Sequence, residues 1–340
     1  GRLEAEGLPV PDLLRQVGDG TFYRDHGGRR QYRTFDGDYR DVARPDGALQ
    51  LEDIKRAGKP VARNGAASLW DVGDDVLCLE FHTKMNALDT DILGLRGGAT
   101  EASPREGYKA LVSQNEGSNF AVGVNLGLAL FVVNVAAWQM VEDLVRQGQD
   151  TFKGIKFAPF PVVGAPSGMA LGGGCEILLH CDAVQAHAET YSGLVEVGVG
   201  LIPGWGGSKE MVLRNVANKK RPGGPMPPVG EAFQTIGLAK VSKSAAEARD
   251  LLFLRASDSI TMNRHRVLAD AKSKALELAP DYVAPEKDIE LSLPGPTARV
   301  ALDMAVSDLA KSGKATPHDV TVSHELATVL SGGNTDVTEA

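Results

Sequence analysis

The middle of the chain consists of short apolar runs separated by turn residues. Residues 76–82 alternate apolar and polar side chains as a strand does, 84–102 continue as a turn and then a helix, and 109–114 form another strand pattern. Strand and helix patterns alternate from there on. This alternation predicts an α/β domain.

The stretch 161–207 shows the clearest order of elements. Residues 162–165 are a short apolar run that ends at Pro166, as expected for a buried strand whose hydrogen-bond ladder cannot continue. Residues 172–174 are consecutive glycines, and they open a run of helical type that includes 177–181. A further strand pattern and two more glycine turns follow.

Residues 120–141 contain no charged side chain, and their length would allow a membrane-spanning helix. Gly123 and Gly127 interrupt the start of this segment, Asn and Gln side chains lie within it, and no basic cluster flanks it. We therefore predict no membrane span here. We expect a buried strand over 120–124 that leads into an apolar helix.

The N-terminal flank is more polar than the middle. Residues 1–66 are rich in Gly, Arg and Asp, and they predict a short helix over 8–18 and a hairpin that turns at Asp36-Gly37. This segment is too polar to form a good core alone. We interpret it as the tail of a preceding domain, followed by a linker over 55–68.

After Gly207 the patterns are mainly helical. A Pro- and Gly-rich interruption over 219–230 predicts a loop. A second linker is expected from Pro285 onward. Two more helices are then predicted over 298–313 and 318–330.

Composition narrows the classes of function. With 340 residues, 43% of them hydrophobic, the chain can bury a sizeable core and hold one large domain or two ordinary ones. The net charge of -8 argues against nucleic acid, although a small anionic ligand needs only a local basic patch. The three cysteines lack disulfide-like spacing, which is typical of a reducing cytoplasm. Because the chain begins at Gly1 without a leader pattern, we expect a piece of a longer protein with no export signal.

Two carboxylates, Glu176 and Glu196, lie in the otherwise apolar stretch 161–207. The glycines before Glu176 permit close backbone approach by a ligand, and the N–H groups of a helix first turn attract negative charge or a developing oxyanion. A flexible turn followed by an acid at a helix start would give the same local pattern. Both interpretations stay open on this motif alone.

Cys175, His180, Cys181 and His187 suggest a zinc site, but their spacing does not fit one. The two cysteines lie six residues apart on one predicted helix, and His187 lies on the next strand. We favour core packing for all four residues and expect no metal site.

The spacing of residues also excludes a dinucleotide-binding loop and a serine-nucleophile motif. Gly198, Gly200 and Gly204 do not form GxGxxG, and no acidic residue follows at the distance expected for a dinucleotide site. Ser167 lies in APSGM, which is not the GxSxG of a serine nucleophile, and no triad can be placed.

Taken together, four motifs resemble the crotonase superfamily of enoyl-CoA hydratases and isomerases. In chain order they are HTKMNALD, FAVGVN, PVVGAPSGMALGGGCEILLHCD and YSGLVEVGVGLIPGWGG. The resemblance covers roughly residues 70–280 and is specific, because the four motifs occur in the order that the family shows. It implies an α/β fold of the crotonase type, with a ββα spiral core and C-terminal helices.

The resemblance also implies the chemistry of the site. The carbonyl of a trans-2-enoyl-CoA thioester would be held by the backbone N–H groups of Val124 and Gly173, which would stabilise the charge that develops on its oxygen. Glu176 and Glu196 would hold one water between them. Glu176 would activate this water and Glu196 would deliver a proton to Cα, giving 3-hydroxyacyl-CoA in fatty acid β-oxidation.

Gly172, Gly204 and Asn125 are implied to shape the substrate pocket. Asn125 stands where the family usually has Asp, and the next helix is apolar where many relatives are charged. The apolar helix suggests a long acyl chain or a domain packed against it. Isomerases of the superfamily can work with the second acid alone, so the presence of both acids favours hydration and leaves Δ3,Δ2-enoyl-CoA isomerisation as an alternative.

The flanks resemble pieces of a bacterial multifunctional fatty acid oxidation protein in which a 3-hydroxyacyl-CoA dehydrogenase precedes the hydratase. This implies a dehydrogenase tail and linker over 1–66, a hydratase domain over 67–283 and a helical extension over 284–340. No cofactor is expected in this chain, because the substrate carries coenzyme A and NAD belongs to a dehydrogenase domain outside it. We expect a cytoplasmic protein that binds acyl-CoA and either forms a homo-oligomer or packs against its own dehydrogenase domain.

Two other classes of function stay open. A non-catalytic acyl-CoA binding module would fit the polar flanks and Asn125. A hydrolase on the same spiral framework would depend on Ser167. Turnover of an enoyl-CoA distinguishes a hydratase from both.

Overall fold

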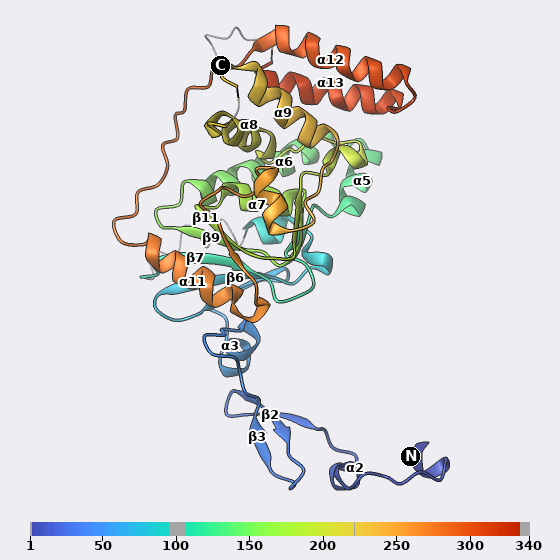
Figure 1. The fold of residues 1–340 in the computed structure, drawn as a ribbon, viewed down its shortest axis with the longest axis vertical. Coiled ribbons are helices and arrows are strands. Elements are labelled where there is room, and N and C mark those ends of the chain that lie inside the picture. The colour runs from blue at the N-terminus through green and yellow to red at the C-terminus, as the bar shows by residue number, and fades with distance from the viewer. Residues whose placement is uncertain (1, 95–106, 221, 334–340) are drawn as a thin grey trace.

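The computed structural model describes residues 2–94, 107–220 and 222–333. Figure 1 shows a central body of sheet and helices, from which an N-terminal arm extends at one end, while a pair of long helices covers the other end. The range 84–102, within which a turn and a helix were predicted, extends past residue 94, so part of it lies outside the described residues, as does the end of the predicted extension 284–340.

Strands and helices alternate through the body of the molecule. The strands are β1 (Tyr23–His26), β2 (Arg29–Arg33), β3 (Tyr39–Asp41), β4 (Ala62–Arg63), β5 (Ala67–Asp71), β6 (Val76–Phe81), β7 (Ala110–Gln114), β8 (Ala121–Val122), β9 (Val162–Ala165), β10 (Gly168–Leu171), β11 (Ala183–His187), β12 (Thr190–Gly193) and β13 (Ser259–Thr261). The α-helices are α1 (Arg2–Ala5), α2 (Asp12–Val17), α3 (Leu51–Ala57), α5 (Leu126–Asn134), α6 (Trp138–Lys156), α7 (Gly173–His180), α8 (Gly207–Ala217), α9 (Met226–Gly237), α10 (Ala245–Asp250), α11 (Val267–Leu278), α12 (Gly295–Lys311) and α13 (Pro317–Ser331). Short 3₁₀ helices are η1 (Lys84–Asn86), η2 (Glu196–Val199) and η3 (Arg264–Arg266).

The main sheet has the strand order β13-β11-β9-β7-β6-β5-β4, with β6, β7, β9, β11 and β13 parallel. Its strands are short and apolar, as expected for a sheet that is covered on both faces. Along β6, Leu77 and Leu79 pack into one core, and Val76 and Cys78 pack into a second core on the other face. Helix α11 lies over that second face, whereas α6, α7 and α8 lie on the first (Figure 1). The predicted strands over 76–82, 109–114 and 162–165 are confirmed.

A second, smaller sheet positions the candidate site. Its order is β12-β10-β8, and all three strands run parallel. Leu171 pairs with Val122 on one side and with Gly193 on the other. The carboxyl ends of these strands therefore meet where α7 begins, close to the acids expected from the sequence.

Two local predictions are wrong. The predicted linker over 55–68 contains the end of α3, all of β4 and the start of β5, and Leu51 at the start of α3 is fully buried in the second core. The loop predicted over 219–230 ends early, because α9 begins at Met226. Prolines are tolerated in the first turn of a helix, since the backbone N–H groups there have no partner within the helix. By contrast, the strand and the apolar helix expected from residue 120 onward are confirmed as β8 and α5. The apolar helix ends at Asn134, and α6 begins separately after Ala136, which has a φ of 54°.

The N-terminal arm carries a small antiparallel sheet. The hairpin expected around Asp36-Gly37 is confirmed as β2 and β3, and β1 adds a third strand that the sequence analysis missed. Few of its side chains are buried, and Phe35 is 84% exposed. In the described part of the chain, no helix combines the length and the apolar character needed to cross a membrane.

Candidate active site

The glycine turn between β10 and α7 is tightly enclosed. Gly172 has a φ of 54°, and a Cβ there would lie 3.2 Å from Glu196 Oε1 and 3.4 Å from Gly123 Cα. A Cβ on Gly174 would lie 2.2 Å from the backbone oxygen of Ala121. These two positions therefore require glycine, one for its left-handed conformation and the other for its contact with β8.

Beside this turn, the backbone N–H groups of Val124 and Gly173 have no hydrogen-bond partner within the described ranges. Each residue lies two positions beyond the paired residues Val122 and Leu171 of neighbouring parallel strands. Leu88 bonds the backbone on both sides of Val124, through Gly123 O and Asn125 N, so the Val124 N–H points away from Leu88. The predicted pair of donors is thus free to bind an acceptor.

Glu176 is fixed by the loop that precedes α8. Its side chain is buried, and its Oε1 accepts hydrogen bonds from the backbone N–H groups of Trp205 (2.9 Å) and Gly207 (2.8 Å). A Cβ on Gly207 would lie 2.9 Å from Glu176 Cγ, so this contact also depends on a glycine. Burial raises the pKa of Glu176 to about 7, although the two hydrogen bonds act in the opposite direction.

Glu196, at the start of η2, is the second acid of the site. Its Oε2 is buried and has no hydrogen-bond partner among the described residues. Burial, together with the charge of Glu176, raises the pKa of Glu196 to about 8. Two nearby acids with pKa values close to neutrality can hold one proton and one negative charge between them, which is the arrangement that acid–base catalysis needs.

Trp205 fills the space behind the glycine turn. Its indole is 4% exposed, packs edge-on against Phe152 with ring centroids 5.4 Å apart, and lies where a Cβ on Gly173 would come within 3.0 Å. On α6, a Cβ at Gly148 would lie 2.1 Å from the indole nitrogen. Glycine at position 148 therefore makes room for the indole of Trp205.

A cluster of buried polar side chains packs against the loop that precedes α8. His180, at the end of α7, places Nδ1 2.7 Å from the backbone oxygen of Glu176, and a Cβ on Gly206 would lie 2.8 Å from its Nε2. Glu210 and Lys156 form a 2.6 Å ion pair next to it. From the sequence, His180 was expected to pack in the core, and no role was predicted for Glu210 or Lys156. The consecutive glycines at 206 and 207 were the signal of a crowded loop.

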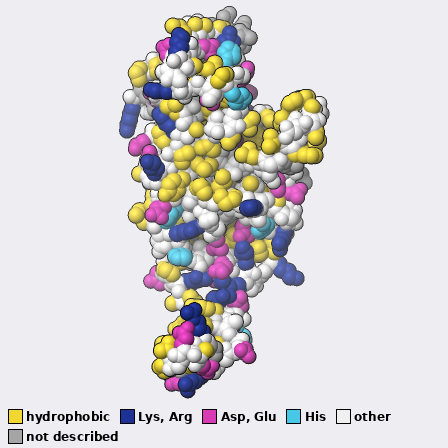
Figure 2. Space-filling model, turned by 90° about the vertical axis from the view of Figure 1, so that its right-hand side faces the viewer, with side chains coloured by type: hydrophobic (Ala, Val, Ile, Leu, Met, Phe, Trp, Pro, Cys, Tyr) yellow, Lys and Arg dark blue, Asp and Glu magenta, His cyan; other side chains and the backbone are white. Residues whose placement is uncertain are grey.

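The remaining predicted pocket residues lie at the edge of this arrangement. Asn125 is exposed and directly precedes α5, and its backbone N–H donates to Leu88 O with an N···O distance of 3.4 Å. The carbonyl of Gly204 accepts a hydrogen bond of 2.9 Å from Gln149, and no atom crowds its Cβ position. Figure 2 shows hydrophobic side chains over the middle of the face to which α5 belongs. The role of Asn125 and Gly204 in binding substrate stays a prediction.

The other residues considered for chemistry are buried. Cys175, Cys181 and His187 are enclosed by the core, and Ser167 is 3% exposed in the turn before β10. Throughout residues 2–94, 107–220 and 222–333, no group of three or more His, Cys, Asp or Glu side chains could hold a metal ion.

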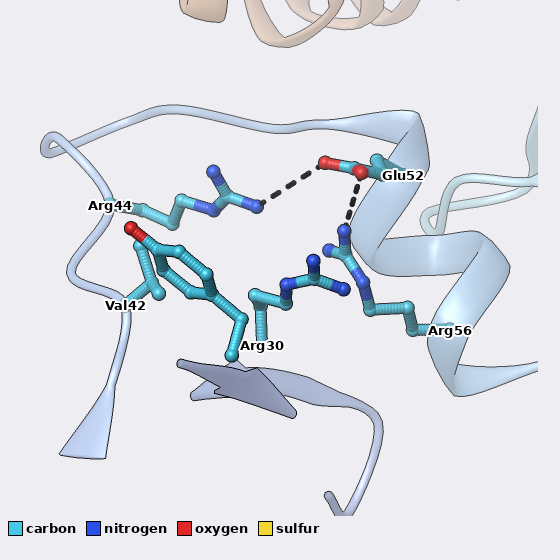
Figure 3. A pocket seen from close by; sticks show the side chains of 6 residues that line it. Arg30, Val42, Arg44, Glu52 and Arg56 are labelled. Carbon is cyan, nitrogen blue, oxygen red and sulfur yellow. Dashed lines mark ion pairs between the residues drawn. The ribbon is translucent and has the colours of Figure 1, made fainter. Parts of the chain in front are cut away.

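Two cavities lie near the N-terminal arm, away from the two acids. The larger, of about 470 Å³, lies between α3, η3 and the end of β7. The smaller, of about 270 Å³, is lined by Arg30, Arg44 and Arg56, with Glu52 between the last two (Figure 3). Each of these arginines is paired with a carboxylate, and the ion pairs of Arg56 link α3 to β1 through Asp25. We interpret this cluster as the connection between the arm and the body.

Comparison with known proteins identifies relatives of this chain. Residues 79–221 match the family model described as enoyl-CoA hydratase/isomerase. A Bacillus subtilis protein described as a probable 3-hydroxyacyl-CoA dehydrogenase is 39% identical over 336 residues, which are 98% of this chain and 42% of that protein. The chain thus spans less than half the length of this relative.

Shorter matches and solved structures agree with the family model. The crotonyl-CoA hydratase of Syntrophomonas wolfei is 31% identical over 138 residues, covering 40% of this chain and 52% of that protein. The fatty acid oxidation complex subunit alpha of Idiomarina loihiensis is 33% identical over 112 residues, covering 33% of this chain and 15% of that protein. The crystal structure of an enoyl-CoA hydratase from a Polaromonas species superposes with a TM-score of 0.54 at 20% identity, over 78% of this chain and 91% of that chain. This superposition confirms the expected spiral α/β fold.

Proposed function

Because this chain belongs to the crotonase family of enoyl-CoA hydratases and isomerases, we propose that it adds water to trans-2-enoyl-CoA to give 3-hydroxyacyl-CoA. The observation that carries this proposal is the buried, unpartnered Oε2 of Glu196 beside a second buried acid. A buried carboxyl oxygen without a hydrogen-bond partner costs free energy. Binding of a water or a substrate atom would remove that cost, so the oxygen is suited to hold one.

The free N–H groups of Val124 and Gly173 would bind the thioester carbonyl. Addition at Cβ moves electron density onto this oxygen, so donors that are already oriented stabilise the transition state more than the ground state. Removing one such donor typically raises the barrier by about 3 kcal/mol. Gly173 also lies in the first turn of α7, where the helix dipole favours negative charge.

The two acids would divide the proton transfers. Glu176 accepts two N–H hydrogen bonds, which stabilise its anion, so it is the better candidate for the ionised base. Glu196 has an unpaired oxygen and faces the charge of Glu176, which favours its protonated form. Glu176 would take a proton from water while the water oxygen bonds to Cβ, and Glu196 would give its proton to Cα. A proton passing from Glu176 to Glu196 would restore the starting state.

Isomerisation is a second candidate for the same site. The unpartnered oxygen of Glu196 could move a proton between Cα and Cγ of a 3-enoyl-CoA without any water. The presence and burial of Glu176 favour hydration, because isomerisation does not require a second acid. Either reaction uses only side chains and backbone of this chain, and coenzyme A arrives as part of the substrate.

The test is loss of the conjugated thioester absorbance of a trans-2-enoyl-CoA series of increasing chain length. We expect turnover by the wild type and a decrease of about 10²–10⁴-fold in kcat for Glu176→Gln and for Glu196→Gln. Glu189→Gln, which alters an exposed carboxylate between β11 and β12, is the matched control. Tight binding without turnover would instead indicate a non-catalytic acyl-CoA module, and turnover of only the 3-enoyl isomer would indicate an isomerase.

We also infer that the reaction serves fatty acid oxidation within a longer protein. The Idiomarina relative is named as part of a fatty acid oxidation complex, and the Bacillus relative is named for the reaction that oxidises the proposed product. On this proposal residues 1–66 connect to a dehydrogenase part, residues 67–283 form the hydratase and residues 284–340 extend it. A coupled assay of the full-length protein, in which NAD is reduced after an enoyl-CoA is added, tests this connection.

A further inference from the structure

His180 is a buried histidine that contacts both the backbone of Glu176 and the loop that binds the Glu176 carboxylate. It is 2% exposed and lies at the last position of α7, one helical turn after Glu176. Burial lowers the pKa of His180 to about 4, so the ring is neutral near pH 7. Because a carbonyl oxygen only accepts hydrogen bonds, the 2.7 Å contact with the backbone oxygen of Glu176 requires the proton to be on Nδ1.

The opposite edge of the ring faces the loop that holds the Glu176 carboxylate. A Cβ on Gly206 would lie 2.8 Å from Nε2 and 2.9 Å from Cε1, so the imidazole lies directly against this glycine. Gly206 lies between Trp205 and Gly207, whose N–H groups donate to Glu176 Oε1. The ring therefore touches the middle of the three-residue segment whose two ends bind the carboxylate.

Buried charges and an aromatic ring fix the imidazole from the other sides. Glu210 Oε1 lies 3.8 Å from Nε2, and it is paired with Lys156 at 2.6 Å and Lys209 at 3.2 Å. Because His180 is neutral above about pH 4, the two lysines are the counter-charges of Glu210 near neutrality. The ring of Phe152 packs on His180 with centroids 5.6 Å apart. The side chain therefore has little freedom to move.

We propose that His180 is a positioning residue, which holds the Trp205–Gly207 loop at the distance that lets both N–H groups bind the Glu176 carboxylate. The proposal rests on hydration as the function of the site. His180 touches neither substrate nor reacting atoms in this scheme, and its effect passes entirely through Gly206 and the backbone of Glu176. Losing it would let the loop relax into the vacated space, lengthen the two hydrogen bonds and weaken the stabilisation of the Glu176 anion.

The pH dependence of activity distinguishes positioning from simple structural support. Because Glu176 must be ionised to act as base, the acid limb of kcat/KM against pH reports its ionisation in the free enzyme. The other titratable groups that interact with these two residues are Glu196 and Cys175 beside Glu176, and Glu210 with its lysines beside His180. All of them are unchanged in a His180 variant, so a displaced acid limb would originate at the loop.

The experiment compares wild type with His180→Met, which fills similar space without the donor, and His180→Asn, whose amide can replace the Nδ1 donor. For His180→Met we expect the acid limb to move upward by about one pH unit, a kcat about 10-fold lower at pH 7 and little change in KM. His180→Asn should recover part of the shift. His187→Met, at another buried histidine on β11, should leave the limb where the wild type has it.

A second measurement separates this proposal from the proposed function. The pKa of the Glu176 carboxyl is followed by NMR with ¹³C-labelled glutamate, assigned by comparison with Glu176→Gln. If the wild type lacks hydratase activity but the Glu176 pKa rises in His180→Met, the function fails and the positioning role holds. A Glu176 pKa and an acid limb that are both unmoved in His180→Met would overturn the positioning role, even if the variant is less stable.

Discussion

Replacing Glu196 by Gln should make the fold more stable at pH 8 while it strongly slows the proposed reaction. The folded protein raises the pKa of Glu196 from the ordinary 4.5 to about 8. Between these values the unfolded chain releases the proton that the folded chain keeps, so the free energy of unfolding falls as pH rises. Below pH 4.5 both states are protonated and this destabilisation disappears. The glutamine variant keeps the shape of the side chain without this titration.

The structure sets the size of the effect. Each unit of pKa difference corresponds to 1.36 kcal/mol, so the upper limit is about 5 kcal/mol at and above pH 8. Glu196 is only partly buried as a residue and part of the shift comes from the charge of Glu176, so we expect a smaller gain. The expected advantage of Glu196→Gln over wild type is about 2–4 kcal/mol at pH 8 and about 1 kcal/mol or less at pH 5.

Urea unfolding at pH 5, 6.5 and 8, followed by tryptophan fluorescence, measures this difference. Glu189→Gln removes an exposed carboxylate from the turn between β11 and β12 and should match wild type at each pH. A Glu196→Gln advantage that is the same at pH 5 and pH 8 would show that the carboxyl titrates normally. In that case the argument that Glu196 is the protonated acid of the pair would be lost.

Three further changes test the surroundings of the site. Gly148→Ala places a methyl group where the Trp205 indole lies, so kcat should fall by about 10-fold or more in the enoyl-CoA assay; unchanged kcat would show that the indole can move freely. Lys156→Met leaves Glu210 buried without its nearest cation and should lower the free energy of urea unfolding by about 3 kcal/mol, whereas a stable variant would show that Lys209 suffices. Leu51→Ala empties a fully buried position where α3 meets the sheet, so it should cost about 2–4 kcal/mol of stability with kcat retained, and a loss of kcat in folded protein would contradict this separation.

The local pattern of the sequence was sufficient to predict the glycine turn and the helix that follows it. Short apolar strands, three glycines and an acid in the first helical turn are all local features, and the structure has β10, the Gly172 turn and Glu176 in that order. The positions of Val124 and Gly173 depended on the family resemblance. In the structure the parallel register of β8 and β10 brings both residues to the same edge, and their role as donors to a substrate stays a prediction.

The contacts that tune the acids were not predictable from local patterns. Trp205 and Gly207 bind Glu176 across 29 and 31 residues, and no spacing rule connects a backbone N–H to a carboxylate so far away. His180 was assigned to the core because its spacing from Cys175, Cys181 and His187 does not fit a metal site, and its contact with Gly206 exists only in the folded chain. The break between α5 and α6 was missed because Ala136 and its direct neighbours, Val135 and Ala137, are apolar and include no glycine or proline.

The buried carboxylates of this protein show why Glu196 is exceptional. Glu210 is paired with Lys156, and Asp258 accepts the backbone N–H of Val184 at 2.9 Å, so their charges are compensated within the fold. Within the described ranges, Glu196 Oε2 is the only carboxylate oxygen that is buried without a partner. Folding alone gives no reason to keep such an atom, since glutamine or an apolar residue would be more stable there. A binding partner that is not part of the polypeptide would explain why this oxygen is kept. The water or the substrate carbon of the proposed reaction would be that partner.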